Sequence, residues 1–405
     1  MTLTGPFTQL LTCEGLPARG ALADDQLTVI PAGGVLHDHG RVVATGAFGE
    51  LLARAAEVDR LTEPTVGLPG FVDCHTHLLW AGSRAADYAA RNAGRSYQEI
   101  AAAGGGIRDT MRRTRAATDA ALAAGLRARL DHHLRAGVTT VEVKTGYGLS
   151  VEQELRMLRL IRQTGRAHRA TVVPTCLAAH VVPPEAAGPA AWLETILTDI
   201  VPVALREDLT RRFDIFVEEG AFSPRLARPF LERLRAAGLD VTVHGDQFTT
   251  GGSELAVAVG ARSVDHLEVA GQAQIEALAA SDTVAVALPG ATLGLGCAFA
   301  PARRLLDAGA TVAIASDWNP GSAPMGDLLT QAAILGVFER LTAAETLAGL
   351  TVRAAAALGL SDRGRLVAGA RADFVGFPTT DYREVLYRQG QLKPNRVWKD
   401  GLTVT

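Results

Sequence analysis

The chain has 405 residues, 48% of them hydrophobic and 20% charged, and a formal net charge of −3. This composition is typical of a globular protein with a large core and excludes a disordered chain. The weak negative charge offers no basic surface for nucleic acid and no polybasic patch for a membrane, so we expect neither partner.

The beginning of the chain carries no evident targeting segment. Residues 1–21 lack a basic start followed by an apolar core, and no apolar run approaches the roughly 20 residues that span a bilayer. The four cysteines are scattered and form no Cys-x-x-Cys pair; they are Cys13, Cys74, Cys176 and Cys297. This spacing favours a reducing compartment over a disulfide framework or a structural zinc site. We therefore expect a cytoplasmic protein.

Short strands with frequent turns fill the first 65 residues. Segments 27–30, 34–37 and 41–45 have the spacing of a small antiparallel β unit. His37-Asp38-His39 lies between the last two of these strands, where Asp-His-Gly is typical of a hairpin turn. We interpret this His-x-His pair as a turn and not as a metal site.

From residue 66 the chain alternates between strand-like apolar runs and amphipathic segments. We predict eight strands, over residues 66–72, 139–144, 170–176, 213–217, 240–244, 263–267, 283–288 and 311–315. The helices predicted between them include residues 119–136, 151–166, 223–237 and 271–280. Eight strands that alternate with helices favour a TIM-like (β/α)8 barrel. A doubly wound sheet would need a glycine-rich phosphate turn after an early strand, and Gly104-Gly105-Gly106 follows no strand of this set.

The end of the chain returns to short strands, predicted over residues 373–376, 385–388 and 396–403. The simplest architecture is an α/β fold in which both termini form a small β-sandwich domain beside the barrel. We assign residues 1–65 and 366–405 to the two halves of that domain and residues 66–365 to the barrel.

Imidazoles and carboxylates recur where the predicted strands end, which is where functional residues gather in such barrels. His75 and His77 follow the first strand, and residues i and i+2 of a strand point to the same side, so both can reach one point. The other strand ends carry His180 (third), His244 to Gln247 (fifth), Asp265 to Glu268 (sixth) and Asp317 (eighth).

His75, His77, His244 and Asp317 together suit one metal ion per subunit, a divalent Zn²⁺ or an iron (Fe²⁺/Fe³⁺). Such an ion lowers the pKa of a bound water towards neutrality and makes hydroxide available as a nucleophile. Asp317 can bind the metal and also receive that water's proton. His266 is the candidate to orient the water or relay the proton.

Residues 69–77 and Ser316-Asp317 resemble the amidohydrolase superfamily, whose members are metal-dependent hydrolases on this barrel with a flanking β-sandwich. Longer segments narrow the resemblance to the members that open the imidazolone ring in histidine degradation; they are residues 82–84, 96–107, 141–148, 288–291 and 317–322 with Pro324. The resemblance covers nearly the whole chain. It implies hydrolysis of the ring amide C–N bond of 4-imidazolone-5-propanoate to N-formimidoyl-L-glutamate by a metal-activated water.

The resemblance also implies roles around a small-molecule substrate with a propionate tail. Arg84 offers a planar, bidentate partner for the carboxylate. The tail or product site should be lined by Tyr147, Asn319, Gly321 and Ser322. His180 and Gln247 should bond the ring, with His180 near the carbonyl oxygen or the leaving nitrogen. The expected catalytic residues are then Asp317, His266 and His180, and a homodimer is usual for such barrels.

Three alternatives stay open. A cyclic amidase of the hydantoinase or dihydroorotase kind would hold two metals with a carboxylated lysine after the fourth strand, but that strand ends at Val217-Glu218-Glu219. Lys144, on the second strand, better suits a salt bridge to a glutamate that is structural or that supports the metal ligands from behind. A cytosine or guanine deaminase would need a carboxyl group where this chain has Gln247, which cannot act as an acid or base. A catalytically inactive relative would have lost a metal ligand, and all four are present.

Overall fold

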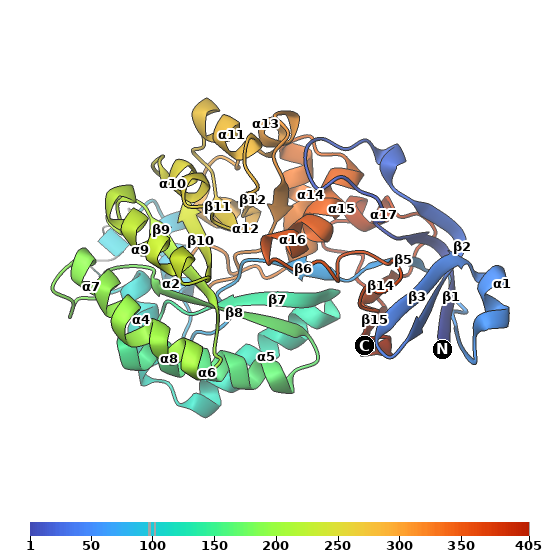
Figure 1. Cartoon of the computed structure of the whole chain (residues 1–405), viewed down its shortest axis with the longest axis horizontal. Coiled ribbons are helices and arrows are strands. Elements are labelled where there is room, and N and C mark those ends of the chain that lie inside the picture. Colours follow the sequence, from blue (N-terminus) through green and yellow to red (C-terminus); the bar gives the residue numbers. More distant parts are fainter. Residues whose placement is uncertain (96–98, 101–102, 405) are drawn as a thin grey trace.

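Two sheets organise the structure, a computed structural model that describes residues 1–95, 99–100 and 103–404 (Figure 1). In this described part of the chain one sheet has eight parallel strands, β6 to β13, and the other is formed by both ends of the chain. The ends of the chain lie together on the terminal sheet, to the right in Figure 1. The predicted barrel and the separate β domain are both confirmed.

The barrel strands follow one another around the sheet in sequence order, and each is parallel to the next. They are β6 (Phe71–Asp73), β7 (Val138–Lys144), β8 (Thr171–Ala179), β9 (Arg212–Val217), β10 (Asp240–Gly245), β11 (Ser263–His266), β12 (Val284–Ala287) and β13 (Val312–Ile314). Such strands are covered on both faces, so their sequences are nearly continuous apolar runs. This is why all eight could be predicted.

The first predicted strand divides at Gly70. Residues before it form β5 (Val66–Pro69), which pairs with strands of the terminal sheet, whereas β6 begins the barrel after it. A Cβ on Gly70 would collide with the side chain of Thr139 on β7, so only glycine fits this close approach. The apolar run predicted as one strand is therefore divided between the terminal sheet and the barrel.

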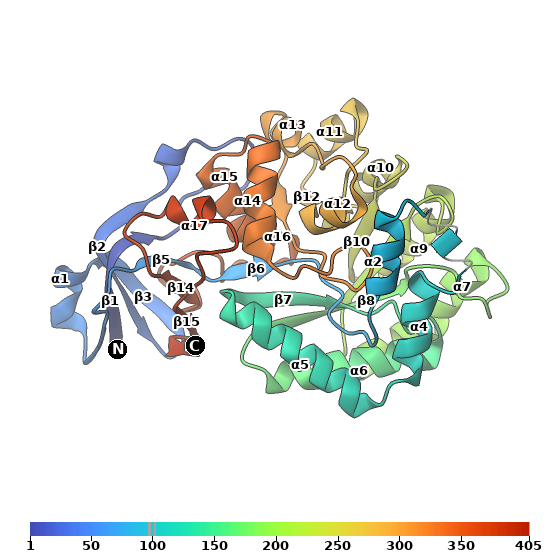
Figure 2. The ribbon, with the colours of Figure 1, turned by 180° about the vertical axis from the view of Figure 1, so that it is seen from behind.

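Helices surround the barrel between successive strands (Figures 1 and 2). They are α2 (Ala85–Asn92), α4 (Ile107–Ala116), α5 (Asp119–Arg135), α6 (Val151–Ala167), α7 (Pro189–Thr195), η3 (Ile196–Ile200), α8 (Val201–Arg206), α9 (Pro224–Ala236), α10 (Gly252–Ala258), α11 (Gln272–Ala279), α12 (Pro289–Leu295), α13 (Ala302–Asp307), α14 (Leu328–Phe338), α15 (Ala343–Leu350) and α16 (Val352–Ala357). The four helices predicted by range match within one residue at each end. Thr118, Ser150 and Thr342 begin α5, α6 and α15 by accepting a hydrogen bond from the backbone N–H three residues on.

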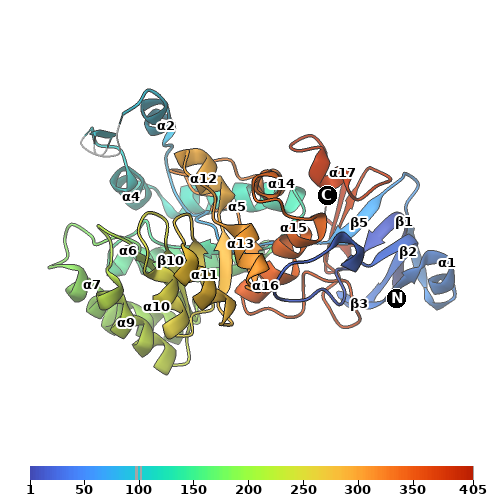
Figure 3. The same ribbon diagram turned by 90° about the horizontal axis from the view of Figure 1, so that it is seen from above.

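Helix α2 stands away from the other helices (Figure 3), and none of its residues is buried. It follows the predicted site residue Arg84 directly. Residues 96–98 and 101–102 of the motif 96–107 lie outside the described residues.

The barrel is closed between its first and last strands by an isolated parallel bridge from Thr76 to Trp318. The N–H of His77 donates to the carbonyl of Trp318 (3.0 Å), and the N–H of Asp317 donates to the carbonyl of His75 (3.0 Å). The closing contact thus lies within the segments that carry the predicted metal ligands.

The terminal sheet has the order β16-β15-β14-β5-β1-β2-β3, with β4 also paired to β1. Besides β5, its strands are β1 (Thr2–Leu11), β2 (Val29–Asp38), β3 (Arg41–Ala47), β4 (Glu57–Arg60), β14 (Phe374–Phe377), β15 (Arg396–Lys399) and β16 (Leu402–Thr403). Short helices lie between these strands along the chain: η1 (Asp24–Gln26), α1 (Phe48–Leu51), η2 (Leu52–Arg54) and α17 (Glu384–Tyr387). The sheet encloses its own core, in which Phe7 lies 5.9 Å from Trp398 between ring centroids, and Phe374 stacks on Trp398 at 4.6 Å. The strand predicted at 385–388 is wrong, because α17 occupies this segment and both edges of β14 are already paired, with β5 and β15.

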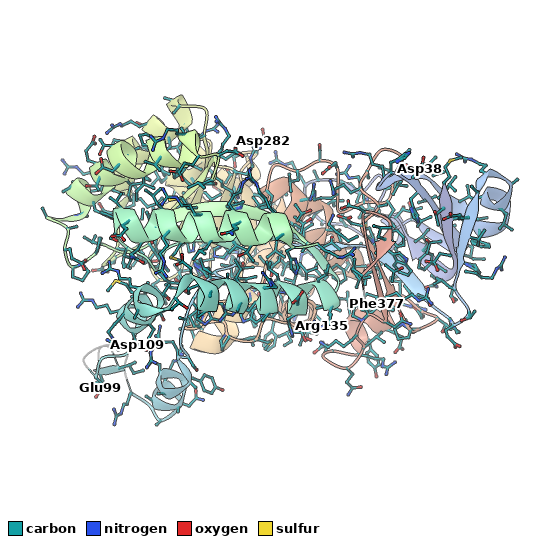
Figure 4. All side chains as sticks on the ribbon, turned by 90° about the horizontal axis from the view of Figure 1, so that it is seen from below. Asp38, Glu99, Asp109, Arg135, Asp282 and Phe377 are labelled. Carbon is teal, nitrogen blue, oxygen red and sulfur yellow. The ribbon has the colours of Figure 1, made fainter. Side chains whose placement is uncertain are left out.

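The barrel and the terminal sheet meet at Phe377, which Figure 4 labels between them. Its ring lies 6.2 Å from that of Phe71 at the start of β6. The N–H of Gly70 also donates to the carbonyl of Asp373 (2.9 Å). Among the described residues, no helix is long and apolar enough to cross a membrane.

Candidate metal centre and substrate site

Four side chains from three parts of the barrel converge where the strands end. One ring nitrogen from each of His75, His77 and His244 lies within 4.8 Å of the other two, and all three residues are buried. Oδ1 of Asp317 lies 3.5 Å from Nε2 of His75 and 3.3 Å from Nε2 of His77. The structure therefore brings all four predicted metal ligands together.

This cluster fits a metal ion. Nε2 of His75 and Oδ1 of Asp317 are buried and have no hydrogen-bond partner, which is costly unless another group satisfies them. Three imidazole nitrogens and one carboxylate oxygen are the donors that Zn²⁺ and iron accept. Within the described part of the chain, these histidines form the one cluster of three or more potential ligands.

The other His-x-His pair is a turn, as the sequence indicated. His37 is buried in β2, with Nε2 3.1 Å from the hydroxyl of Thr4. His39 has a left-handed backbone (φ 47°) and a side chain that is 96% exposed. The two imidazoles do not share a site.

Burial and local charge set the protonation of the cluster. Burial lowers the pKa of His77 to about 3 and that of His244 to about 4, so both imidazoles are neutral. Burial alone would raise the pKa of Asp317, but the imidazoles of His75 and His77 beside it hold it well below its usual range. Burial and Lys144 act to lower the pKa of His75, yet Asp265 and Asp317 outweigh them and raise it to about 9. Metal binding would release this proton.

Two carboxylates behind the histidines fix their orientation. Oδ2 of Asp265 lies 2.6 Å from Nδ1 of His75, and Oδ2 of Asp214 lies 3.1 Å from Nδ1 of His244. A carboxylate can only accept, so Nδ1 of His75 carries the proton and its Nε2 offers its lone pair to the cluster, while Asp214 lies at ion-pair distance from Nδ1 of His244. Sequence reasoning gave neither aspartate a role. The available signal was a charged side chain within a buried strand, which rarely occurs without a partner.

His266 lies beside the cluster, with its ring centroid 5.4 Å from that of His244 and 5.9 Å from that of His75. Its Nδ1 is 3.5 Å from Oε1 of Glu268, which also accepts a hydrogen bond from the hydroxyl of Thr292 (3.3 Å). Sequence reasoning assigned no role to Glu268 either.

The backbone turns left-handed at His266 (φ 95°) and at Asp317 (φ 51°). Conformations of this kind cost roughly 1–3 kcal/mol for residues other than glycine and cluster at functional sites. The fold therefore tolerates strain at two of the predicted catalytic residues.

His180 and Tyr147 form a wall next to the metal ligands. The ring of His180 stacks on that of His77 at 5.4 Å, and Tyr147 lies 5.8 Å from both rings. Nδ1 of His180 donates to the carbonyl of Gly146 (3.2 Å), which leaves Nε2 for another partner. Burial lowers the pKa of His180 well below its usual value.

Tyr147 interacts electrostatically with Arg84. Burial and Asp317 raise the pKa of Tyr147, while Arg84 and Arg129 act in the opposite direction, so its hydroxyl lies in the field of both the carboxylate and the guanidinium groups. Arg84 is only 12% exposed; its Nε donates to Asp87, and its Nη1 donates to the hydroxyl of Thr110 (3.4 Å).

The loop after Asp317 is held by the amide of Asn319. Its Oδ1 accepts from the N–H groups of Gly321 (2.7 Å) and Ser322 (2.8 Å), and its Nδ2 donates to the carbonyl of Asp317 (2.8 Å). A Cβ on Gly321 would lie 3.3 Å from Nη1 of Arg84, so this loop and Arg84 are adjacent. Asn319 thus shapes the loop that the sequence predicted to line the tail site.

Gln247 is buried and follows β10 three residues after His244. The preceding residue, Asp246, accepts a hydrogen bond from the N–H of Gly252 (2.8 Å) and has a left-handed backbone (φ 57°). Asp246 therefore fixes the turn that carries Gln247.

Comparisons with known proteins point in one direction. The amidohydrolase family profile matches residues 100–404. The chain is 44% identical over 404 residues to the imidazolonepropionase of Deinococcus deserti, covering 100% of this chain and 99% of that protein. It is 45% identical over 394 residues to the imidazolonepropionase of Deinococcus radiodurans, covering 96% of each.

Solved structures share the fold at lower sequence identity. Atrazine chlorohydrolase TrzN of Arthrobacter aurescens TC1, complexed with zinc, has a TM-score of 0.74 and 17% identity, covering 100% of this chain and 95% of that one. An adenosine deaminase of Xanthomonas campestris with bound zinc has a TM-score of 0.70 and 18% identity, covering 99% and 92%. At this identity the likeness establishes the fold alone.

Proposed function

This chain belongs to the amidohydrolase family and, within it, to the imidazolonepropionases, and on that premise we propose that it hydrolyses the ring amide C–N bond of 4-imidazolone-5-propanoate to N-formimidoyl-L-glutamate in histidine degradation. The observation that carries the proposal is full-length identity of 44% to an imidazolonepropionase. The buried cluster of three histidines and Asp317 supports the hydrolytic chemistry.

A metal ion here would be held by the three histidines and by Asp317. When bound there, it lowers the pKa of a coordinated water and so supplies the nucleophile for amide hydrolysis. We propose Zn²⁺ or Fe²⁺/Fe³⁺, since this donor set suits both elements.

Three residues of this chain handle protons and orientation. Asp317 accepts the proton of the attacking water, because its carboxylate lies within the histidine cluster. His266, which lies against His75 and His244, orients the water. His180 bonds the ring at the carbonyl oxygen or the leaving nitrogen, because Gly146 already occupies its Nδ1.

The propionate tail is recognised by Arg84. Its guanidinium group can bind a carboxylate through two parallel hydrogen bonds. The backbone of Gly321 lies beside it, and Tyr147 lies next to the rings of His77 and His180, so Tyr147 and residues 319–322 complete the tail site. Gln247 bonds the ring without taking part in proton transfer.

Two further properties belong to the proposal. The four cysteines are free, with Cys297 exposed, and this supports a location in the reducing cytoplasm. Val337, Phe338 and Tyr387 are 65–77% exposed on the adjoining helices α14 and α17, an apolar surface that a second copy could cover in a homodimer. Light scattering of the purified chain tests the dimer.

A cyclic amidase with two metals would need a lysine after the fourth barrel strand, and this chain has none there. The fourth barrel strand, β9, ends at Val217 and is followed by Glu218, whose carboxylate accepts the N–H of Phe248 (2.9 Å). Lys144 lies on β7 and is ion-paired with Glu142 and Asp214. A mononuclear centre is therefore favoured.

One experiment tests the function. Metal content per subunit is measured together with turnover of 4-imidazolone-5-propanoate, followed by loss of the ring absorbance and appearance of N-formimidoyl-L-glutamate. We expect one metal ion per subunit and turnover. Stoichiometric metal without turnover would contradict the substrate and leave the hydrolase class intact, whereas absence of metal would contradict the site.

A further inference from the structure

A buried lysine lies beneath the metal ligands. The side chain of Lys144, at the end of β7, is 0% exposed, as are those of Glu142 and Asp214. Its Nζ lies 2.7 Å from Oε1 of Glu142, 2.7 Å from Oδ2 of Asp214 and 3.9 Å from Oδ2 of Asp265. A buried ammonium group is costly unless it is paired, so these carboxylates explain how the core holds it.

Two of the partners are the aspartates that orient metal ligands. Oδ2 of Asp214 is shared between Nζ of Lys144 and Nδ1 of His244 (3.1 Å). Oδ2 of Asp265 lies next to Nδ1 of His75 (2.6 Å) and in ionic reach of the same Nζ. One cation therefore faces the carboxylates behind two different histidines.

The third partner reaches the His-x-His segment. Oε2 of Glu142 accepts the N–H of Thr76, the residue between His75 and His77 (3.1 Å). The N–H of Lys144 itself donates to the carbonyl of Thr76 (2.9 Å). The segment after β6 and strands β7, β9 and β11 are thereby joined at one point next to the cluster.

We propose that Lys144 is a positioning residue of the metal centre, acting through the carboxylates of Asp214 and Asp265. Its ammonium group holds each carboxylate in the place where it can accept from an imidazole Nδ1. Without this cation the two aspartates repel each other and move apart. The histidine rings then lose their orientation, and the affinity for metal falls. This role goes beyond a structural salt bridge, since it predicts a change in metal binding and not only in stability.

The test compares Lys144→Met with Lys399→Met. Lys399 is a matched control because it is also buried and paired with two carboxylates, Asp373 (3.1 Å) and Asp400 (2.8 Å), but lies in the terminal sheet. Zinc affinity is measured by competition with a chromophoric chelator, without substrate. We expect about 10–100-fold weaker zinc binding in K144M, the usual effect of losing an outer partner of a metal ligand, and no more than about twofold in K399M. The visible spectrum of the Co²⁺-substituted protein should change in K144M alone.

Unchanged zinc affinity in folded K144M, or equal weakening in K399M, would overturn the proposal. If K144M does not fold, Asp265→Asn replaces it, because this nearly isosteric change removes the charge and one acceptor oxygen between Lys144 and His75; zinc affinity equal to that of the wild type would again overturn it. The inference rests on the proposed metal centre, yet its readout needs no turnover. A wild-type chain that binds zinc but does not convert the imidazolone would contradict the reaction and leave this inference standing.

Discussion

The guanidinium group of Arg84 lies against the backbone of Gly321. A Cβ at position 321 would be 3.3 Å from Nη1 of Arg84 and 3.3 Å from Oδ1 of Asn319, a spacing tighter than ordinary contact. Arg84 precedes α2, whereas Gly321 follows the last barrel strand, so the fold alone brings them together. Glycine at 321 keeps this side of the guanidinium group free of a side chain.

Replacing Arg84 by Ala should therefore raise KM for 4-imidazolone-5-propanoate strongly. A hydrogen bond to a charged group contributes about 1.5–3 kcal/mol, which corresponds to an increase of about 10–100-fold in KM. The change in kcat should be smaller, since the guanidinium group does not touch the reacting bond. Steady-state kinetics give both constants, and an unchanged KM would contradict the carboxylate-binding role.

The ion pair between Arg84 and Asp87 supplies the control. Asp87→Asn removes that pair but leaves the guanidinium group in place. If Arg84 binds the propionate, D87N should raise KM much less than R84A. An equal increase in KM in both variants would indicate that the salt bridge, and not contact of Arg84 with the substrate, determines KM.

Gly321→Ala should raise KM several-fold. The added methyl group forces Arg84 or Asn319 to shift by a few tenths of an ångström, which disturbs the orientation of a bidentate contact. Gly49→Ala is the control, because a Cβ there has no neighbour within 4 Å. G321A with wild-type KM would show that the loop does not border the bound tail.

The barrel could be predicted because parallel strands buried on both faces are continuous apolar runs. The terminal sheet was harder. β1 (Thr2–Leu11) was missed because Gly5 and Pro6 interrupt its pattern as a turn would, and β4 because it is short and mostly exposed. At 385–388 the apolar residues suit a strand, but the neighbouring positions in the sheet are already filled.

Residue spacing and position at strand ends were enough to select His75, His77, His244 and Asp317. Their partners were not predictable in the same way. Which inward-facing carboxylate meets which imidazole depends on the stagger between strands, and pairs such as Asp265 with His75 come from strands that are not neighbours. Lys144 had no particular residue assigned as its partner for the same reason.

Removing the metal with a chelator should abolish activity and lower Tm. An ion present at 100 times its Kd stabilises the folded state by about 2.7 kcal/mol, and this contribution disappears with the ion. Zn²⁺ or Fe²⁺ added back should restore both activity and Tm. His244→Ala should bind no stoichiometric metal, whereas His37→Ala, which removes a buried imidazole of the terminal sheet, should retain it. Metal loss in H37A or metal retention in H244A would contradict the site.

Glu268→Gln should lower kcat and leave KM nearly unchanged. Oε1 of Glu268 is 3.5 Å from Nδ1 of His266, so its carboxylate fixes the imidazole that orients the water. His266→Asn should lower kcat more than Glu268→Gln does, because it removes the imidazole that orients the water. Thr292→Val removes the hydrogen bond from the hydroxyl of Thr292 to Oε1 of Glu268 and should have only a small effect. An E268Q enzyme with wild-type kcat would exclude Glu268 as a positioning residue.

Gln247→Ala should lower kcat less than tenfold, since an amide can bond the ring but cannot take up or release a proton. Asp317→Asn should lower kcat far more, because it removes both a metal ligand and the proton acceptor. Gln247 follows directly on Asp246, whose carboxylate fixes the turn, so Asp246→Asn is needed to separate a disturbed turn from a lost contact. We expect D246N to lower Tm and Q247A to leave it unchanged. A loss of kcat in Q247A as large as in D317N would mean that the ring cannot be oriented without this amide. That result would contradict the roles proposed for Asp317, His266 and His180.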